Sequence, residues 1–210
     1  MKKIITFILL LCISFTYAQS KYEKGMTKAF ELWKNKKNND ASLLFERIAK
    51  AEKENWLPYY YVASVEILSS FGIKDEAVLN AKLKKAQEYL DEASSLSQNN
   101  PEIIINQALL NTAYIAFDGQ KYGMTLSMKN SALYKQALTL APNNPRVILG
   151  KAEWDMGSAK YFGQSITPYC KDVEKSIALF EKEKLPKFYP SYGMDRAKQI
   201  LKSCTTKKEK

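Results

Sequence analysis

A segment near the middle of the chain returns about 44 residues later, and this repeat limits the folds open to it. Residues 93–101 read ASSLSQNNP, and residues 137–145 read ALTLAPNNP. Each copy follows a helix-forming stretch and opens an apolar segment with a small residue, Ala108 or Ala152. Repetition at this period is typical of stacked supersecondary units, none of which can bury its apolar face alone. Such architectures usually bind other molecules and seldom catalyse reactions.

The rest of the chain reads almost entirely as helix. Its seven prolines and eight glycines lie mainly at segment borders, where they end helices rather than interrupt them. Asp40 is placed to cap one of these helices at its N-terminus. The pattern predicts an all-α fold with helices over residues 21–35, 41–54, 56–71, 75–96, 101–117, 126–140, 145–162, 168–184 and 191–204.

Small residues repeat in register within this pattern. Ala63, Ala108 and Ala152 each lie seven positions after a predicted helix start, which is nearly two helical turns. A small residue at the same place on each helix allows a neighbouring helix to approach closely. Three matches at coordinated positions support the repeat.

The run YKQALTLAPNNP at residues 134–145 resembles the end of one tetratricopeptide (TPR) repeat and the start of the next. Residues 87–101 resemble it more weakly, with Gln98 where the first run has Pro142. The chain is also similar to small exported TPR-like proteins of Gram-negative bacteria, which have no assigned activity. The resemblance implies antiparallel helix hairpins stacked as a short TPR-like α-solenoid. A compact helical bundle of the same hairpins is the alternative, because the period exceeds the 34 residues of the family.

The N-terminus has the pattern of a secretory signal. Lys2 and Lys3 precede an apolar run at residues 4–15, and Thr16-Tyr17-Ala18 suits cleavage after Ala18. The apolar run is shorter than the roughly 20 residues that span a bilayer, and no other stretch is more apolar. We therefore expect a cleaved Sec-type signal peptide at residues 1–18 and no transmembrane segment in the mature chain.

The mature chain should form a single helical domain at residues 19–204, followed by a disordered basic tail at residues 205–210. Export predicts a periplasmic location, with secretion as the alternative. A lipid anchor on Cys12 is disfavoured, because the bulky Leu11 precedes it.

The chain carries a formal charge of +10, and loss of the two signal lysines lowers this to +8 (10 − 2). Only Arg47, Arg146 and Arg196 are arginines, whereas recognition of phosphates and bases favours guanidinium groups. The charge therefore predicts no nucleic-acid partner. The charge also allows weak attraction to an anionic envelope surface. One hypothesis for the function is therefore a basic envelope-associated structural protein.

Residues that carry common enzyme chemistry are missing from the sequence. It contains no histidine, which is the commonest general base and transition-metal ligand. It also lacks a glycine-rich phosphate loop and a Cys-x-x-Cys pair. The sequence thus predicts no catalytic residue, cofactor or metal, and the protein is not expected to be an enzyme.

The leading hypothesis is a non-catalytic exported adaptor that binds a protein or peptide segment in a helical groove. The TPR resemblance implies that the first helix of each pair lines this groove. Polar side chains on those helices could hold a peptide backbone or a carboxylate through hydrogen bonds. The candidates are Asn106, Asn111 and Arg146.

A second hypothesis is a small-ligand or glycan-binding module that uses aromatic side chains. Tyrosine and tryptophan combine an apolar ring with a polar edge, which suits binding surfaces. Two clusters stand out: Trp56 with Tyr59, Tyr60 and Tyr61, and Trp154 with Tyr161, Phe162 and Tyr169. Residues 117–123 are a further candidate for recognition, as an extended turn with two glycines and two aromatics. Core packing is the alternative for both clusters.

The two cysteines of the mature chain, Cys170 and Cys204, could form a disulfide. Export exposes the protein to an oxidising compartment, where an even number of cysteines permits a bridge. Cys170 lies near the start of one predicted helix and Cys204 at the end of the next, so antiparallel packing would bring them together. Two separate buried thiols are the alternative.

Overall fold

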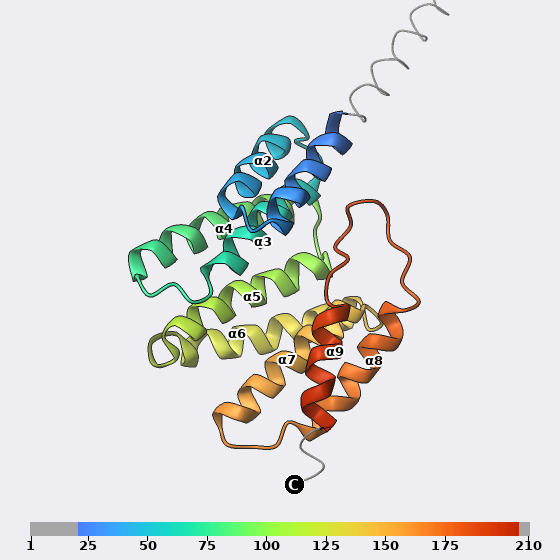
Figure 1. The fold of residues 1–210 in the computed structure, drawn as a ribbon. Helices are drawn as coiled ribbons and strands as arrows, with labels where there is room; N and C mark the ends of the chain where they lie inside the picture. Colours follow the sequence, from blue (N-terminus) through green and yellow to red (C-terminus); the bar gives the residue numbers. More distant parts are fainter. Residues whose placement is uncertain (1–20, 206–210) are drawn as a thin grey trace, which may run out of the picture. The chain divides into compact units, whose positions relative to one another are not determined.

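The computed structural model describes residues 21–205. The predicted signal peptide lies outside the described residues, and so does the predicted tail apart from Thr205. Within the described range every regular element is an α-helix or a single 3₁₀ turn, and none is a strand (Figure 1). The all-α prediction is confirmed. The helices form two compact units, one up to Leu96 and one from Ser97 onward, which we call unit 1 and unit 2.

Unit 1 is a set of helices joined by short turns. A helix over residues 21–34 comes first. It is followed by α2 (Asn38–Ala51), α3 (Trp56–Ser70) and α4 (Glu76–Leu96). Helix α3 packs against both α2 and α4, as the predicted hairpins require.

The core of unit 1 is rich in aromatic rings. Phe30 lies against Tyr61 and Phe45, with ring centroids 4.7 Å and 5.3 Å away. Tyr60 and Tyr61 are buried at 1% and 4% exposure. Edge-to-face and stacked rings of this kind add to the free energy gained from burying their apolar area.

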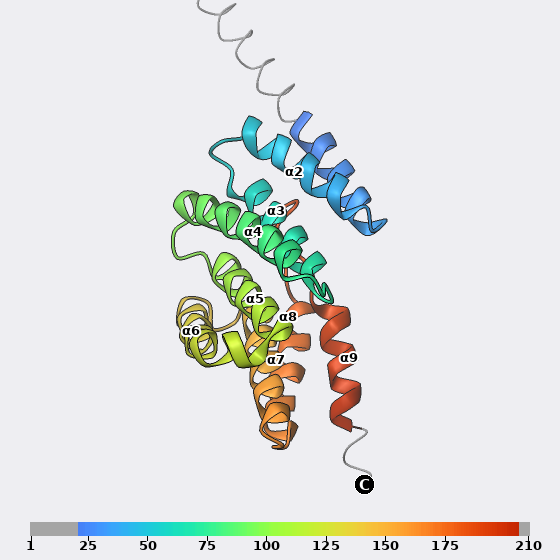
Figure 2. The same ribbon diagram turned by 90° about the vertical axis from the view of Figure 1, so that its left-hand side faces the viewer.

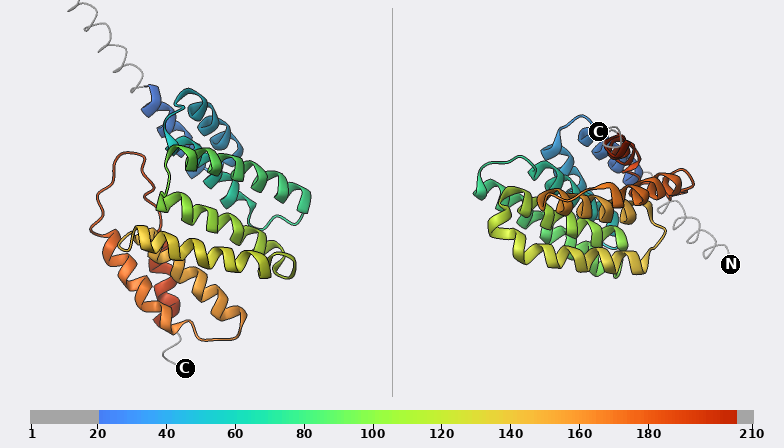
Figure 3. Two further views of the ribbon diagram at one scale, coloured as in Figure 1. Left: turned by 180° about the vertical axis from the view of Figure 1, so that it is seen from behind. Right: turned by 90° about the horizontal axis from the view of Figure 1, so that it is seen from below.

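Unit 2 has the longer set of elements. It consists of α5 (Pro101–Phe117), α6 (Gly119–Leu140), α7 (Pro145–Tyr161), a 3₁₀ turn η1 (Thr167–Tyr169), α8 (Cys170–Phe180) and α9 (Met194–Thr205). Helices α5 and α6 form an antiparallel hairpin, and α8 packs against both α7 and α9 (Figures 2 and 3). Antiparallel helix hairpins are thus the building blocks in both units.

The repeated Asn-Asn-Pro sequence marks two helix starts. Asn100 precedes α5, and its side chain accepts a hydrogen bond from the Glu102 N–H at 2.9 Å. Asn144 precedes α7 and accepts from the Arg146 N–H at 2.9 Å. The proline that follows each asparagine occupies the first helical position, where its missing N–H costs nothing. The repeat is therefore a pair of N-terminal caps, and its small residues Ala108 and Ala152 are fully buried.

Substitution of the two capping asparagines should destabilise unit 2 unequally. Asn100→Ala removes a cap and should cost about 1 kcal/mol. Asn144→Ala should cost about 2 kcal/mol, because its Nδ2 also donates to Glu102 Oε1 at 2.7 Å. Urea unfolding followed by circular dichroism measures both. The control, Asn39→Ala, replaces an exposed asparagine in α2 and should change stability by less than about 0.5 kcal/mol. If Asn144→Ala lowers the free energy of unfolding no more than Asn39→Ala does, Asn144 does not stabilise the start of α7 as described.

Three predicted boundaries are wrong. Helix α2 begins at Asn38, so Asp40 lies inside its first turn rather than at the cap. Helix α6 begins at Gly119, because the Asp118 side chain accepts from two N–H groups of the next turn. The extended turn expected over residues 117–123 is therefore mostly helix.

The third boundary lies between α8 and α9. Helix α8 ends at Phe180, and α9 begins only at Met194. Residues 181–193 connect them without a helix, and Pro186 and Pro190 lie within this connection. Both prolines also lie within the shorter connection that the sequence predicts. Gly193 has a φ of 116°, which is not helical, so α9 starts only after it.

Candidate functional site

The polar residues predicted to bind a partner lie inside unit 2. Asn106, Asn111 and Arg146 are 2%, 7% and 3% exposed. Asn111 donates to the Asn130 Oδ1 at 2.9 Å, and Asn130 in turn donates to the Ala108 carbonyl at 3.0 Å. This buried network joins α5 to α6. The structure thus buries Asn106 and places Asn111 between α5 and α6, so little of either side chain can meet a partner.

Arg146 lies at the centre of a separate buried cluster of charges. Its Nε donates to Glu102 Oε1 at 2.8 Å, and its two terminal nitrogens donate to the two carboxylate oxygens of Glu183 at 2.8 Å and 2.5 Å. Glu102 and Arg146 are 44 residues apart, so they occupy the same position of the repeat. All three nitrogens of the guanidinium donate within the cluster, which joins α5, α7 and the segment after α8.

Glu102 is the most deeply buried member of this cluster, with no exposed surface. Burial raises the pKa of Glu102, although Arg146 and Asn144 oppose the shift. Its Oε2 is buried without a hydrogen-bond partner among the described residues. A proton on Oε2 would leave the bonds to Oε1 intact.

An open cavity of about 380 Å³ adjoins the cluster. It lies between the start of α7 and residues 179–189, and its lining includes Leu179, Leu185 and Tyr189. The lining also includes Arg146 and Glu183, which already bind each other.

The two predicted aromatic clusters differ in their burial. In the first, Trp56 packs against the buried Tyr60 with ring centroids 5.6 Å apart, so these rings belong to the core of unit 1. In the second, Trp154 packs on the buried Tyr134 in unit 2. Tyr161 and Phe162 remain exposed, and these two residues are the part of the second cluster that can meet a ligand.

Four strongly exposed apolar residues lie on α6 and at the end of α7 in unit 2, and we call them the Met–aromatic surface. Met124 and Met128 are 85% and 72% exposed, and their spacing of four places them on one face of α6. Tyr161 and Phe162 are 77% and 69% exposed, with ring centroids 5.1 Å apart in an edge-to-face contact. The start of α6 and the end of α7 lie at the same end of unit 2 in both Figure 1 and Figure 3.

Sequence reasoning identified only the aromatic half of this surface. The predicted helix starts at residue 126, which leaves Met124 outside it, so the spacing of Met124 and Met128 on one helix goes unseen. The available signal was Asp118, a strong N-cap residue directly before Gly119. A helix begun there puts the two methionines one turn apart.

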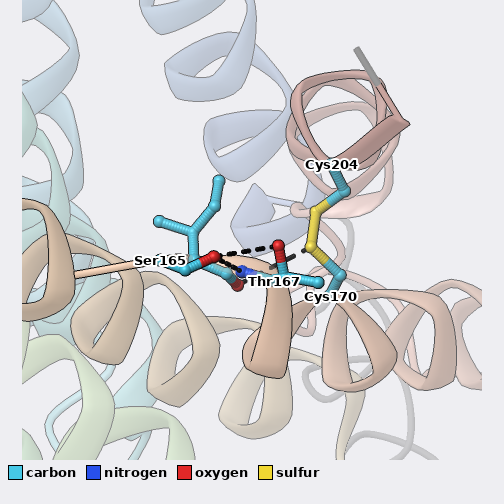
Figure 4. The surroundings of a disulfide bond; sticks show 5 residues. Ser165, Thr167, Cys170 and Cys204 are labelled. Atoms are coloured by element: carbon cyan, nitrogen blue, oxygen red, sulfur yellow. Dashed lines mark hydrogen bonds between the residues drawn. A yellow bond between two sulfur atoms is a disulfide. The ribbon is translucent and has the colours of Figure 1, made fainter. Parts of the chain in front are cut away.

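The two cysteines of the described chain form a disulfide (Figure 4). Cys170 begins α8 and Cys204 lies in the last turn of α9, and their Cα atoms are 6.0 Å apart. The turn before α8 is closed by Ser165, whose Oγ donates to Thr167 Oγ1 at 3.0 Å. The bridge therefore fixes α9 on α8.

Neither a metal site nor a membrane-spanning helix is found in the part of the chain that the structure describes. No group of three or more histidine, cysteine or acidic side chains there is arranged to hold a metal ion. No helix over residues 21–205 combines the length and apolar character needed to cross a membrane.

Comparison with known proteins identifies a similar fold but no family. No protein-family model matches the chain, and no curated protein sequence matches it. Its structure is similar to the HusA haemophore from Porphyromonas gingivalis, with a TM-score of 0.78 and 24% sequence identity over 89% of this chain and 94% of that one. A thermophilic TPR protein from Thermus thermophilus is a more distant match, with a TM-score of 0.42 and 14% identity over 88% of this chain and 99% of that one. The first comparison shows a shared helical fold.

Proposed function

We propose that this protein is an exported, non-catalytic binding scaffold for a flat apolar ligand, and that a haem-type porphyrin is the ligand to test first. The observation that carries the proposal is the Met–aromatic surface. Soluble proteins seldom expose a contiguous apolar patch without a binding role, and the proposal takes these four side chains to form one such patch. Methionine adapts its shape to a partner, and aromatic rings stack on flat ligands.

The fold comparison supports the choice of porphyrin. HusA is described as a haemophore, and it shares this helical fold over nearly the whole chain. The secretory pattern at residues 1–18 would place the present protein where a haem carrier acts. The absence of histidine favours carriage over catalysis, because it removes the commonest general base.

The absence of histidine also affects how a porphyrin would be bound. Without histidine no imidazole–iron bond can form, and the side chains of this surface able to ligate iron are Met124, Met128 and Tyr161. We expect ring contacts to supply most of the affinity. Protoporphyrin IX without iron should therefore bind within about tenfold of haemin, since apolar contact does not depend on the metal.

Titration of the mature protein with haemin and with protoporphyrin IX tests the proposal through tryptophan quenching and the Soret band. Met124→Ser with Met128→Ser should weaken binding roughly tenfold or more, because two apolar contacts are lost. Tyr161→Ser with Phe162→Ser should do the same.

The matched control is Leu43→Ser, which alters a 51% exposed apolar residue of α2. It should leave the affinity unchanged, and all variants should keep the helical signal of the parent protein. If Leu43→Ser weakens porphyrin binding as much as the paired variants do, or if neither pair weakens it, the Met–aromatic surface is not the binding site.

A protein or peptide segment is the second candidate ligand, as the TPR resemblance implies. The exposed methionines also favour it, because flexible methionine surfaces accept varied apolar peptides. Crosslinked capture from the cell envelope separates the two candidates. A single protein partner lost on Met124→Ser with Met128→Ser, together with no porphyrin binding, would establish the adaptor role.

A further inference from the structure

Residues 181–193, which we call the strap, connect α8 to α9 in unit 2. They contain no helix, and two backbone positions have positive φ: Phe188 at 63° and Gly193 at 116°. In Figure 1 the strap is the long orange-red loop that leaves α8 and returns to α9.

A polar and an apolar anchor are among the contacts that hold the strap to the helices. The first is polar: Glu183 receives two hydrogen bonds from the buried Arg146 of α7. The second is apolar: Gly193 lies so close to Phe180 that an added Cβ would be 2.5 Å from the ring. Between these anchors, Leu185 and Tyr189 of the strap line the 380 Å³ cavity together with the start of α7.

The polar anchor has more negative than positive groups. One guanidinium, Arg146, meets two carboxylates, and Glu102 Oε2 has no hydrogen-bond partner among the described residues. The charged or titratable groups that face Glu102 are Arg146 from α7 and Glu183 and Tyr189 from the strap. A proton on Glu102 leaves Arg146 and Glu183 as a balanced pair.

We propose that the strap is a proton-controlled latch: it is closed while Glu102 is protonated, and it opens over the cavity when Glu102 ionises. An ionised Glu102 competes with Glu183 for the single guanidinium and repels it. Glu102 is completely buried, whereas the Glu183 side chain is 17% exposed. Glu183 therefore leaves for water at the lower cost, and it takes the strap with it.

The direction of the pH dependence follows from the burial of Glu102. Burial raises its pKa above the ordinary 4.5, so the closed state binds the proton more tightly than an open, hydrated state does. The closed state is most stable below pH 4.5 and loses that stability as the pH rises through the raised pKa. The strap should thus be more open at about pH 8 than at about pH 5.

Hydrogen–deuterium exchange of the strap, corrected for the intrinsic effect of pH, measures this opening. We expect protection of residues 181–193 to fall at least about tenfold between roughly pH 5 and pH 8. Glu102→Gln is neutral at every pH and should keep the protection at the higher pH, whereas Glu183→Gln should lose it at both pH values.

The control is Glu174→Gln, which neutralises an exposed carboxylate of α8 and should behave like the parent protein. Equal strap protection at the two pH values in the parent would overturn the proposal. A Glu102→Gln variant that opens as the parent does would also overturn it. None of these readouts depends on a ligand, so the latch and the proposed porphyrin binding can fail separately.

Discussion

Arg146→Ala should lower the free energy of unfolding of unit 2 by about 3–5 kcal/mol, the largest single-residue effect that we expect. The guanidinium is buried at 1% side-chain exposure and pairs with Glu102 and Glu183. Its removal leaves Glu102 buried with no cationic partner, and an unpaired buried charge is far more costly than a lost surface contact. Urea unfolding near pH 7 measures the loss.

Urea unfolding of Arg146→Ala near pH 5 gives a second test, because the cost of the substitution should depend on pH. Glu102 has a raised pKa, and loss of Arg146 raises it further because an attractive cation is gone. Protonation then relieves part of the penalty, so the cost should be smaller at the lower pH. The matched control, Arg196→Ala, removes an ion pair whose side chains are 58% and 33% exposed and should cost less than about 1 kcal/mol. An Arg146→Ala cost equal to this control would show that the buried cluster does not stabilise unit 2.

Replacement of both bridged cysteines, Cys170→Ser with Cys204→Ser, should destabilise unit 2 by roughly 3–4 kcal/mol. The bridge closes a segment with a sequence separation of 34, and its removal restores the conformational freedom of that segment in the unfolded chain. Helix α9 depends strongly on the bridge, because its main packing partner is α8. The expected order of loss is therefore α9 first and the α5–α6 hairpin last.

Thermal unfolding with and without reductant checks this prediction. The reduced parent protein should match the double variant, since both lack the crosslink. Hydrogen exchange should locate the lost protection in α8 and α9. Equal stability of the oxidised parent and the double variant would mean that packing alone holds α9 in place.

Local sequence signals predicted the helices of this protein well. The capping asparagines Asn100 and Asn144, each followed by proline, act through hydrogen bonds within a few residues, so their meaning can be read without the fold. Ala108 and Ala152 were correctly expected at close helix contacts because their spacing fixes the face on which they lie. The order of two adjacent helices made a Cys170–Cys204 bridge possible but left two separate thiols open, and the structure has the bridge.

The surroundings of the residues predicted to bind a partner could not be predicted from local signals. Asn111 and Arg146 have polar side chains, which usually face solvent, yet each finds its hydrogen-bond partners in segments distant in sequence. A polar side chain can be buried when distant groups satisfy it, and this pairing depends on the packed helices. Met124 and Met128 show the converse, because apolar residues are expected in a core and only the packing of α6 leaves them exposed.

The all-α class, most helix starts and the close-packed small residues can be predicted from local sequence, since they depend on interactions within a turn or two of helix. The tertiary structure alone decided which side chains are buried in the Glu102–Arg146–Glu183 cluster and which form the Met–aromatic surface. Burial and charge pairing depend on groups brought together from distant positions, and the positions of those groups exist only once the helices have packed.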